Sequence, residues 1–129
     1  MRNNNQWTES RFHSFVKGGL RSISNRWPPK FAVKKASWLK RGFYMCAGYG
    51  IRPHEVPASF VNEKGKRENN IFCDHISPVV DTEEGFTSWD NLIERLFCEA
   101  DGLQILCKVC HDLKSKDERD RRTVAKRNK

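Results

Sequence analysis

The sequence predicts an α+β fold in which a basic pair of helices precedes two strands and a final helix. Apolar residues recur with helical spacing over residues 9–26, which indicates the first helix. Residues 71–76 contain the aromatic Phe72 and the β-branched Ile71 and Ile76, and residues 103–106 form a second short apolar run, so we expect two strands there. A helix is expected to begin near Cys107 or Lys108. The predicted order is strand, long connection, strand, helix.

Residues 1–42 are expected to form a basic helical N-terminal segment. Thr8 can cap the first helix, because its hydroxyl oxygen can accept a hydrogen bond from a free backbone N–H of the first turn. Pro29 can open a second helix, since proline fits the first helical turn, and Gly42 is expected to end it.

The main domain is expected at residues 43–122, followed by a disordered basic tail at residues 123–129. Within the domain, residues 43–46 indicate a short strand, and the polar residues 62–70 indicate a mobile loop. The long connection between the two strands is expected to hold its own helix at residues 88–97, whose first residue is a serine suited to be the N-cap.

Composition excludes several classes of protein. No run of 18 apolar residues exists, which excludes a membrane span. The first ten residues lack the apolar centre of a secretory signal. The five cysteines are an odd number, which argues against a disulfide framework and for metal binding or packing. We therefore expect a soluble protein of the cytoplasm.

The charge distribution is more informative than the net charge of +8. Residues 1–45 carry a balance of +9, residues 72–112 a balance of −7, and residues 113–129 a balance of +5. Basic flanks around an acidic centre suit a protein that binds a polyanion and holds a cation beside it. Mixed surface charge that serves solubility is the alternative that charge alone leaves open.

Three residues could form a hydrolytic site. Asp74 and His75 end the first predicted strand and His111 lies in the first turn of the final helix, so a hairpin packed on that helix brings them together. Neighbours on a strand point to opposite sides, so one of the pair can hold a metal while the other reaches a water. A histidine base and one divalent cation can hydrolyse a phosphodiester. Taken alone, an Asp-His pair after a strand is more often a polar turn.

The sequence also combines Asp-His-Ile-x-Pro at residues 74–78 with Leu-Gln-x-Leu-Cys-x-x-Cys-His-x-x-Lys at residues 103–114. This combined pattern resembles the HNH endonucleases, most closely the small stand-alone HNH proteins of tailed bacteriophages. The likeness spans residues 74–118, and residues 26–30 and 44–50 are similar to that group as well.

The resemblance implies a ββα-metal core (HNH, His-Me finger) and cutting of DNA by a one-metal mechanism. His75 matches the family's general base. Asp74 and His111 match its ligands of a catalytic divalent metal such as Mg²⁺ or Mn²⁺. If the protein is phage-encoded, the host cytoplasm is its expected location.

One departure from the family lies at Gly102, where the family's middle asparagine usually stands. Because that asparagine mainly steadies the loop, its loss is expected to affect the efficiency of cleavage more than its possibility. Asn91, in the helix between the strands, is a candidate to take its place.

A second departure concerns a structural zinc site, which many relatives build from four cysteines. Tyr49 stands where one of these cysteines would be, and a neutral phenol is a poor zinc ligand. One alternative is a site of three cysteines and one histidine, with Cys73 as a weaker candidate; its members are Cys46, His54, Cys107 and Cys110. The other alternative, which the sequence slightly favours, is that zinc has been lost and the cysteines pack as small apolar residues.

Several basic residues are candidate contacts to DNA phosphates. Lys114 shares a helix face with His111 and could touch the scissile phosphate or its neighbour, and Lys108 is a weaker candidate. The candidates in the helical pair are Arg21, Arg26, Lys30, Lys34 and Lys35. Solvated surface charge is the alternative for each of them.

The sequence therefore predicts a metal-dependent HNH endonuclease that nicks or cuts DNA, its main partner, without contact to a membrane. Proteins of phage DNA packaging or recombination are candidate further partners. The alternative is a catalytically weak DNA-binding accessory, or an interaction protein, that keeps the fold. Gly102 and Tyr49 favour this alternative, whereas retention of Asp74, His75 and His111 together argues against it.

Overall fold

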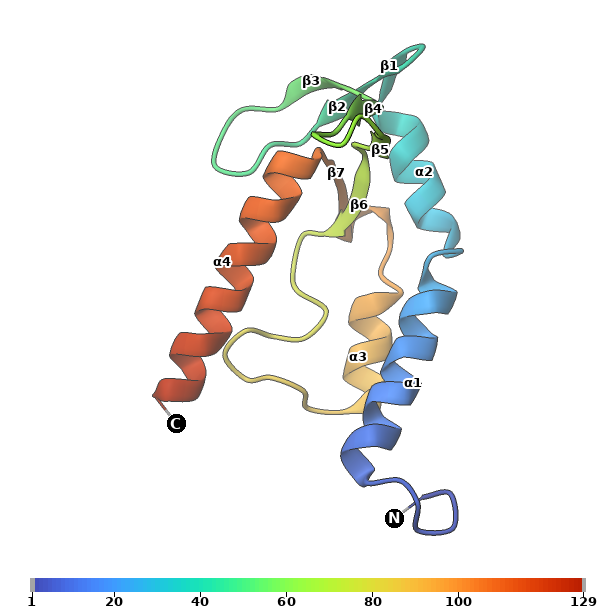
Figure 1. Ribbon diagram of the computed structural model, residues 1–129, viewed down its shortest axis with the longest axis vertical. Helices are drawn as coiled ribbons and strands as arrows, with labels where there is room; N and C mark the ends of the chain where they lie inside the picture. Colours follow the sequence, from blue (N-terminus) through green and yellow to red (C-terminus); the bar gives the residue numbers. More distant parts are fainter. Residues whose placement is uncertain (1, 129) are drawn as a thin grey trace.

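The computed structural model describes residues 2–128, which form four α-helices and seven short strands in three antiparallel sheets (Figure 1). The predicted α+β class is therefore confirmed. Met1 and Lys129 lie outside the described residues. None of the described helices is long and apolar enough to cross a membrane.

The N-terminal segment begins with helix α1 (Glu9–Ser24), and its predicted cap is confirmed. The backbone N–H of Arg11 donates to the Thr8 hydroxyl oxygen at 3.1 Å. Trp27 ties this segment to the rest of the molecule, because its indole N–H donates to the backbone oxygen of Cys98 at 2.7 Å. The segment is therefore packed on the domain that follows it.

Helix α2 (Pro28–Ser37) begins one residue before the predicted Pro29, with both prolines in its first turn, and it ends before Gly42. Strand β1 (Trp38–Lys40) leaves the helix and pairs with β2 (Phe43–Cys46). Gly42 lies in the turn between them with φ +82°, a conformation that glycine adopts without steric cost. The expectation of helix up to Gly42 is therefore wrong, since pairing with β2 overrides local helix preference.

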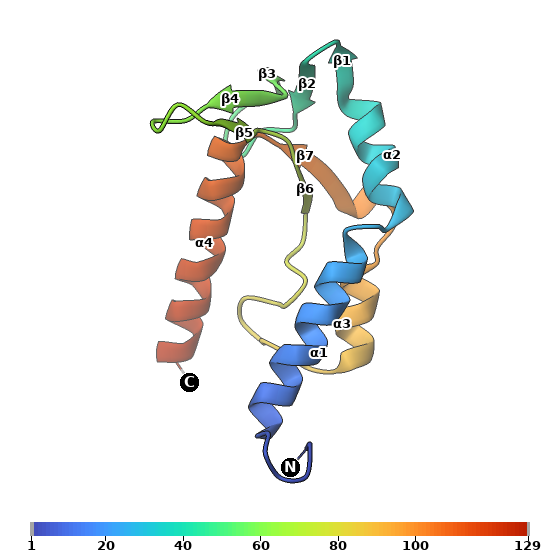
Figure 2. The same ribbon diagram turned by 45° about the vertical axis from the view of Figure 1, so that its right-hand side comes forward.

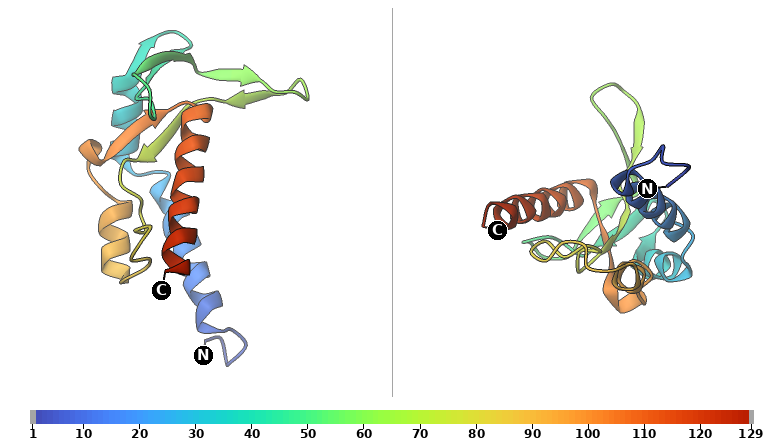
Figure 3. Two further views of the ribbon diagram at one scale, coloured as in Figure 1. Left: turned by 90° about the vertical axis from the view of Figure 1, so that its left-hand side faces the viewer. Right: turned by 90° about the horizontal axis from the view of Figure 1, so that it is seen from below.

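Strand β3 (His54–Pro57), which the sequence did not reveal, completes the first sheet in the order β1-β2-β3. Strands β4 (Ser59–Val61) and β5 (Arg67–Asn69) form a separate hairpin that projects from the body of the molecule (Figure 3). The expectation of a mobile loop is thus wrong for β5, although the turn of the hairpin lies in the predicted loop.

The remaining elements follow the predicted order. Strand β6 (Phe72–His75) pairs antiparallel with β7 (Leu103–Leu106). Between them lie helix α3 (Trp89–Leu96), capped by the predicted serine, and a 3-10 turn (Ala100–Gly102).

Helix α4 (Lys108–Arg127) begins directly after β7. It includes residues 123–127, so the expectation of a disordered tail is wrong there. Helices α1 and α4 lie on opposite sides of the connection from β6 to α3 (Figures 1 and 2).

The main core lies between β2, β3, β7 and the first turn of α4. Helix α2 covers β7, and α1 contacts α3. The buried residues of this core are Cys46, Val56, Ile71, Ile105, Leu106, Cys107 and Cys110. Three of its seven members are cysteines, so the same place in the fold serves as core and as a candidate metal centre.

Candidate functional site

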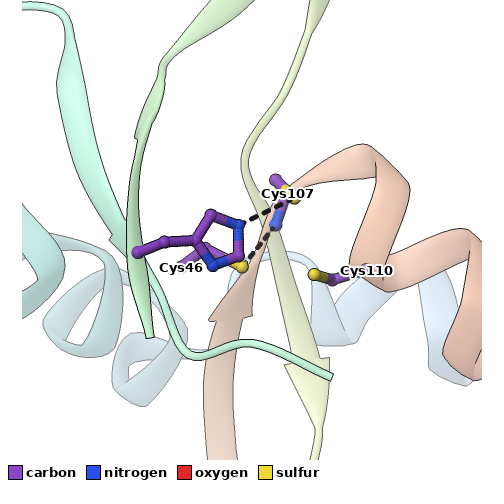
Figure 4. A group of neighbouring side chains, drawn as sticks. Cys46, Cys107 and Cys110 are labelled. Carbon is purple, nitrogen blue, oxygen red and sulfur yellow. Dashed lines mark hydrogen bonds between the residues drawn. The ribbon is translucent and has the colours of Figure 1, made fainter. Parts of the chain in front are cut away.

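Four side chains of the core converge at the start of α4: Cys46, His54, Cys107 and Cys110. One ligand atom from each lies within 4.8 Å of all the others. Cys46 and Cys110 are almost completely buried. Figure 4 shows the three cysteines side by side, Cys46 from β2 and the other two from the start of α4.

Two simple local features bring these ligands together. Cys46 and His54 are direct partners in the β2–β3 pairing, which places their Cβ atoms about 5 Å apart. Cys107 is the N-cap of α4 and Cys110 lies in its first turn, so both thiols face the same end of the helix. The partial positive charge of a helix N-terminus favours thiolates there.

Hydrogen bonds orient the sulfur and nitrogen ligands. The Cys46 sulfur accepts from the backbone N–H groups of Gly48, at 3.4 Å, and Cys107, at 3.3 Å. The His54 Nδ1 lies 3.0 Å from the backbone oxygen of Arg52. Because that oxygen only accepts, Nδ1 carries the proton, and the lone pair of Nε2 faces the Cys107 sulfur at 3.8 Å.

The acidity of the thiols differs. Burial acts to raise the pKa of Cys107, but the hydrogen bond from the Cys110 backbone and then the contact with the His54 imidazole outweigh it and lower the pKa to about 7. Burial raises the pKa of the Cys110 thiol to about 11. Backbone hydrogen bonding to Arg52, followed by the contact with Cys107, raises the pKa of His54. Three sulfurs and one imidazole nitrogen match Zn²⁺ in type and number.

Two sequence interpretations of this region change. Tyr49 does not point at the cluster, because its hydroxyl donates to the Asp117 carboxylate at 2.6 Å. Cys73 lies on β6, outside the cluster. The slight preference for loss of the site is not supported by this geometry, in which the four residues of the first alternative could hold a metal ion.

The turn after β2 supplies a test of how the cluster is held. Gly48 has φ +83°, and a Cβ there would lie 2.3 Å from the Ile51 backbone oxygen. We expect Gly48→Ala to lower the free energy of unfolding by about 2–4 kcal/mol, from backbone strain plus the clash, and to weaken metal binding. Gly50→Ala is the matched control, with φ +71° but open space around the new Cβ, and about 1 kcal/mol is expected. Thermal melts with zinc titration measure both, and equal effects would contradict the clash.

A cavity of about 350 Å³ lies between strand β6, helix α4 and the N-terminal helical segment. Strand β6 contributes Asp74 and His75, and α4 contributes His111. The N-terminal segment contributes Arg21 and Lys30. The three residues that the sequence predicted as a hydrolytic site therefore line one cavity, together with two of the predicted basic residues.

Asp74 is held by a buried cation. Its Oδ2 atom lies 3.2 Å from the Lys114 ammonium and accepts from the Gln104 amide at 3.1 Å. Lys114 also donates to Glu118 at 2.7 Å and to the His75 backbone oxygen at 3.0 Å. With 6% of its surface exposed, Lys114 is an internal tether, and its prediction as a phosphate contact is wrong.

His75 faces a different element from Asp74, as alternation along a strand requires. Its Nε2 lies 2.8 Å from the Leu96 backbone oxygen at the end of α3, so Nε2 carries the proton and Nδ1 the lone pair. Burial, and then the nearby charge of Lys30, lower the pKa of His75. The imidazole is therefore neutral at neutral pH, the form that a general base requires.

His111 stacks on the Phe72 ring, with centroids 4.8 Å apart and planes inclined by 17°. Its Nδ1 lies 3.7 Å from an Asp112 oxygen, which leaves Nε2 for a ligand. The hydrogen bonds of Asp74 use Oδ2, which leaves Oδ1. A carboxylate and an imidazole suit a divalent cation that keeps open positions. Among the described residues, no further Asp, Glu, Cys or His side chain completes a group of three metal ligands with Asp74 and His111.

At Gly102, where the resemblance implies an asparagine, a backbone hydrogen bond holds the chain that follows β6. The Gly102 oxygen accepts from the Ile76 N–H at 3.0 Å, which fixes the chain just after His75. A Cβ at Gly102 would lie 2.9 Å from the Cys98 sulfur, so a side chain there requires a shift. Asn91, in the first turn of α3, donates to the Thr87 hydroxyl and does not line the cavity. It therefore does not take the place of the family's asparagine.

The sequence interpretation missed Asn25, Glu118 and Arg122, which also line the cavity. Asn25 is the C-cap of α1, and no local pattern indicates that this helix end faces the site. Of the other predicted basic residues, Lys108 pairs with Asp112 at 2.8 Å and Lys34 lies over the Tyr44 ring, whereas Arg26 and Lys35 are exposed away from the cavity lining.

Comparison with known protein families, with curated proteins and with solved structures finds no match. Residues 2–128 define the class of an α+β protein with four α-helices, small antiparallel sheets and a histidine–cysteine cluster that could hold a metal ion. Any narrower assignment depends on the chemistry of the cavity residues.

Proposed function

We propose that the protein is a metal-dependent endonuclease of the HNH type that hydrolyses DNA phosphodiester bonds. The observation that supports this most is the cavity itself. Asp74, His75 and His111 line it together, and the cations Arg21 and Lys30 lie in its wall. An anionic phosphate is the substrate that such a wall attracts. The strand–strand–helix order of β6, β7 and α4 agrees with the ββα-metal core that the resemblance implies.

Each residue has a distinct part in the reaction. His75 takes a proton from the attacking water through Nδ1, while its bond to the Leu96 carbonyl fixes the ring. The new bond forms between the water oxygen and phosphorus, and the bond from phosphorus to the 3′ oxygen breaks. Asp74 and His111 would hold a cation such as Mg²⁺ or Mn²⁺, which would neutralise charge on the phosphate and assist the leaving oxygen.

Lys114 positions Asp74 rather than the substrate. Its ammonium joins the Asp74 and Glu118 carboxylates and the His75 carbonyl, and so ties β6 to α4. The cluster of three cysteines and one histidine is separate from this chemistry and would hold a structural Zn²⁺.

The test is incubation of supercoiled plasmid with purified protein that has been dialysed free of loosely bound cations. Nicked or linear product is expected with added Mg²⁺ or Mn²⁺ and not without them. Dialysis is preferable to a strong chelator, which would also compete for the cysteine cluster. No product with either cation, or equal product without them, would contradict the proposal.

A second candidate is the catalytically weak DNA-binding accessory, and the Lys114–Asp74 ion pair favours it. An ammonium 3.2 Å from the carboxylate competes with a divalent cation for the same charge. This candidate predicts salt-sensitive DNA binding without cation-dependent product. An interaction protein, for example one acting with packaging or recombination proteins, would instead bind a protein partner and have no affinity for DNA.

A further inference from the structure

A second cavity, of about 360 Å³, adjoins the first. Arg21, Val80 and Arg122 line both cavities, so the two are adjacent, and residues of α1 and α4 line each of them. Lys17 on α1 and Lys126 on α4 line only the second cavity. Four basic side chains from two helices, which are far apart in the sequence, therefore face one hollow next to the hydrolytic residues.

The charge of these four residues is not neutralised locally. Among the described residues, Lys17, Arg21, Arg122 and Lys126 form no ion pair within 4.0 Å. Arg122 donates to the Val80 backbone oxygen, at 3.1 Å. Burial, followed by the charges of Arg21 and Arg122, lowers the pKa of Lys17. The cations therefore repel one another, and a bound anion would relieve that repulsion.

Two acidic residues also line the second cavity, Asp81 and Glu83. Asp81 is already engaged, because its Oδ1 accepts from the backbone N–H groups of Glu83 and Glu84 at 2.8 Å each. It shapes the turn between β6 and α3. Glu83 is exposed. Four cations against two carboxylates leave a positive balance in this hollow.

The spacing along α4 relates the two cavities to a nucleic acid. Arg122 and Lys126 lie 11 and 15 residues beyond His111, which corresponds to roughly 16 and 22 Å along the helix axis. One strand of B-DNA rises about 3.4 Å per nucleotide. The two cations therefore lie roughly five and roughly seven nucleotides from the hydrolytic residues. On α1, Lys17 is one turn from Arg21 and extends the opposite wall.

From this geometry we infer that Lys17, Arg21, Arg122 and Lys126 form a phosphate groove that binds the backbone of duplex DNA on one side of the cut, about five to seven nucleotides from it. The inference rests on the proposed function and adds to it where the substrate runs. Contacts to phosphates carry no sequence information, so the groove supplies affinity and register without choosing a sequence.

The test measures binding of the full-length protein to a duplex of about 30 base pairs at several salt concentrations, without divalent cation. Lys17→Ala/Lys126→Ala removes two cations of the groove. Lys64→Ala/Lys66→Ala, in the turn of the β4–β5 hairpin, is the control with the same change in net charge. The plot of log affinity against log salt concentration has a negative slope. Its magnitude is expected to decrease by about 2 in the groove variant and to stay constant in the control.

The outcomes separate the groove from the nuclease proposal. A groove variant with the slope of the unmodified protein, or a control that loses as much, would overturn the groove. Selective loss in the groove variant, in a protein that cuts no plasmid, would support the groove while the nuclease proposal fails. Absence of DNA binding by the unmodified protein would overturn both.

Discussion

Replacing His75 with alanine is expected to lower the rate of DNA cleavage by about 10²–10⁴-fold, the usual contribution of a general base. The loss should appear in the rate of the chemical step and not in DNA affinity, because the cations that bind phosphate remain. Single-turnover cleavage at saturating protein measures the rate, and the same duplex without divalent cation measures the affinity.

Two further variants make this result specific. His75→Gln keeps an N–H that can reach the Leu96 oxygen but has no basic nitrogen, so it should be as slow as alanine. His13→Gln changes a histidine that packs against Phe86 and Trp89, away from the cavity lining, and should cut normally. Unchanged cleavage by His75→Ala would exclude the role given to this residue.

The pH dependence of cleavage is an independent test of His75 as the general base. Because burial lowers the pKa of His75, the residue stays neutral to more acidic pH than a free histidine. The cleavage rate should therefore be level around pH 7 and fall only below about 6.5, the ordinary histidine value. A rate that already falls on going from pH 8 to pH 7 would contradict a lowered pKa for the base.

The second large effect is expected at the cysteine cluster. The purified protein should contain one Zn²⁺ per chain, and Cys110→Ala should lose it and lower the free energy of unfolding by at least about 4 kcal/mol. The effect should stay below the roughly 10–16 kcal/mol that zinc contributes to the smallest zinc-dependent folds. Here Val56, Ile105 and Leu106 provide an apolar core beside the cysteine cluster.

Cys73→Ala is the matched control for this prediction, since it removes a partly buried thiol from β6 outside the cluster. It should keep the zinc and most of the stability. Elemental analysis gives the metal content, and urea unfolding gives the stability. Zinc-free protein as purified, or loss of zinc from Cys73→Ala with retention in Cys110→Ala, would exclude the assignment.

Features that depend on a few neighbouring residues could be predicted from the sequence. Thr8 caps α1 through a bond to the N–H three residues later, and the serine before α3 does the same. The positions of β6 and β7 each follow from a short apolar run. These signals are local, so tertiary context does not change them.

Features that depend on distant contacts could not be predicted. Residues 38–40 leave the helical pattern because β2 offers them a partner. Lys114 has the spacing of a surface lysine one turn after His111, and only the fold shows that Asp74 and Glu118 enclose it. The sequence contained the four possible zinc ligands, but the position of His54 opposite Cys46 became visible only with β3.

Helix α4 carries one member of the proposed hydrolytic trio near its start and two cations of the inferred groove near its end, with no interruption between them. Every residue added to such a helix rotates the far end by roughly 100°. A single insertion between His111 and Arg122 would therefore turn Arg122 out of the cavity while leaving His111 in place. If the groove binds DNA as inferred, the distance from the cut to the DNA contact can therefore change only in steps close to whole helical turns.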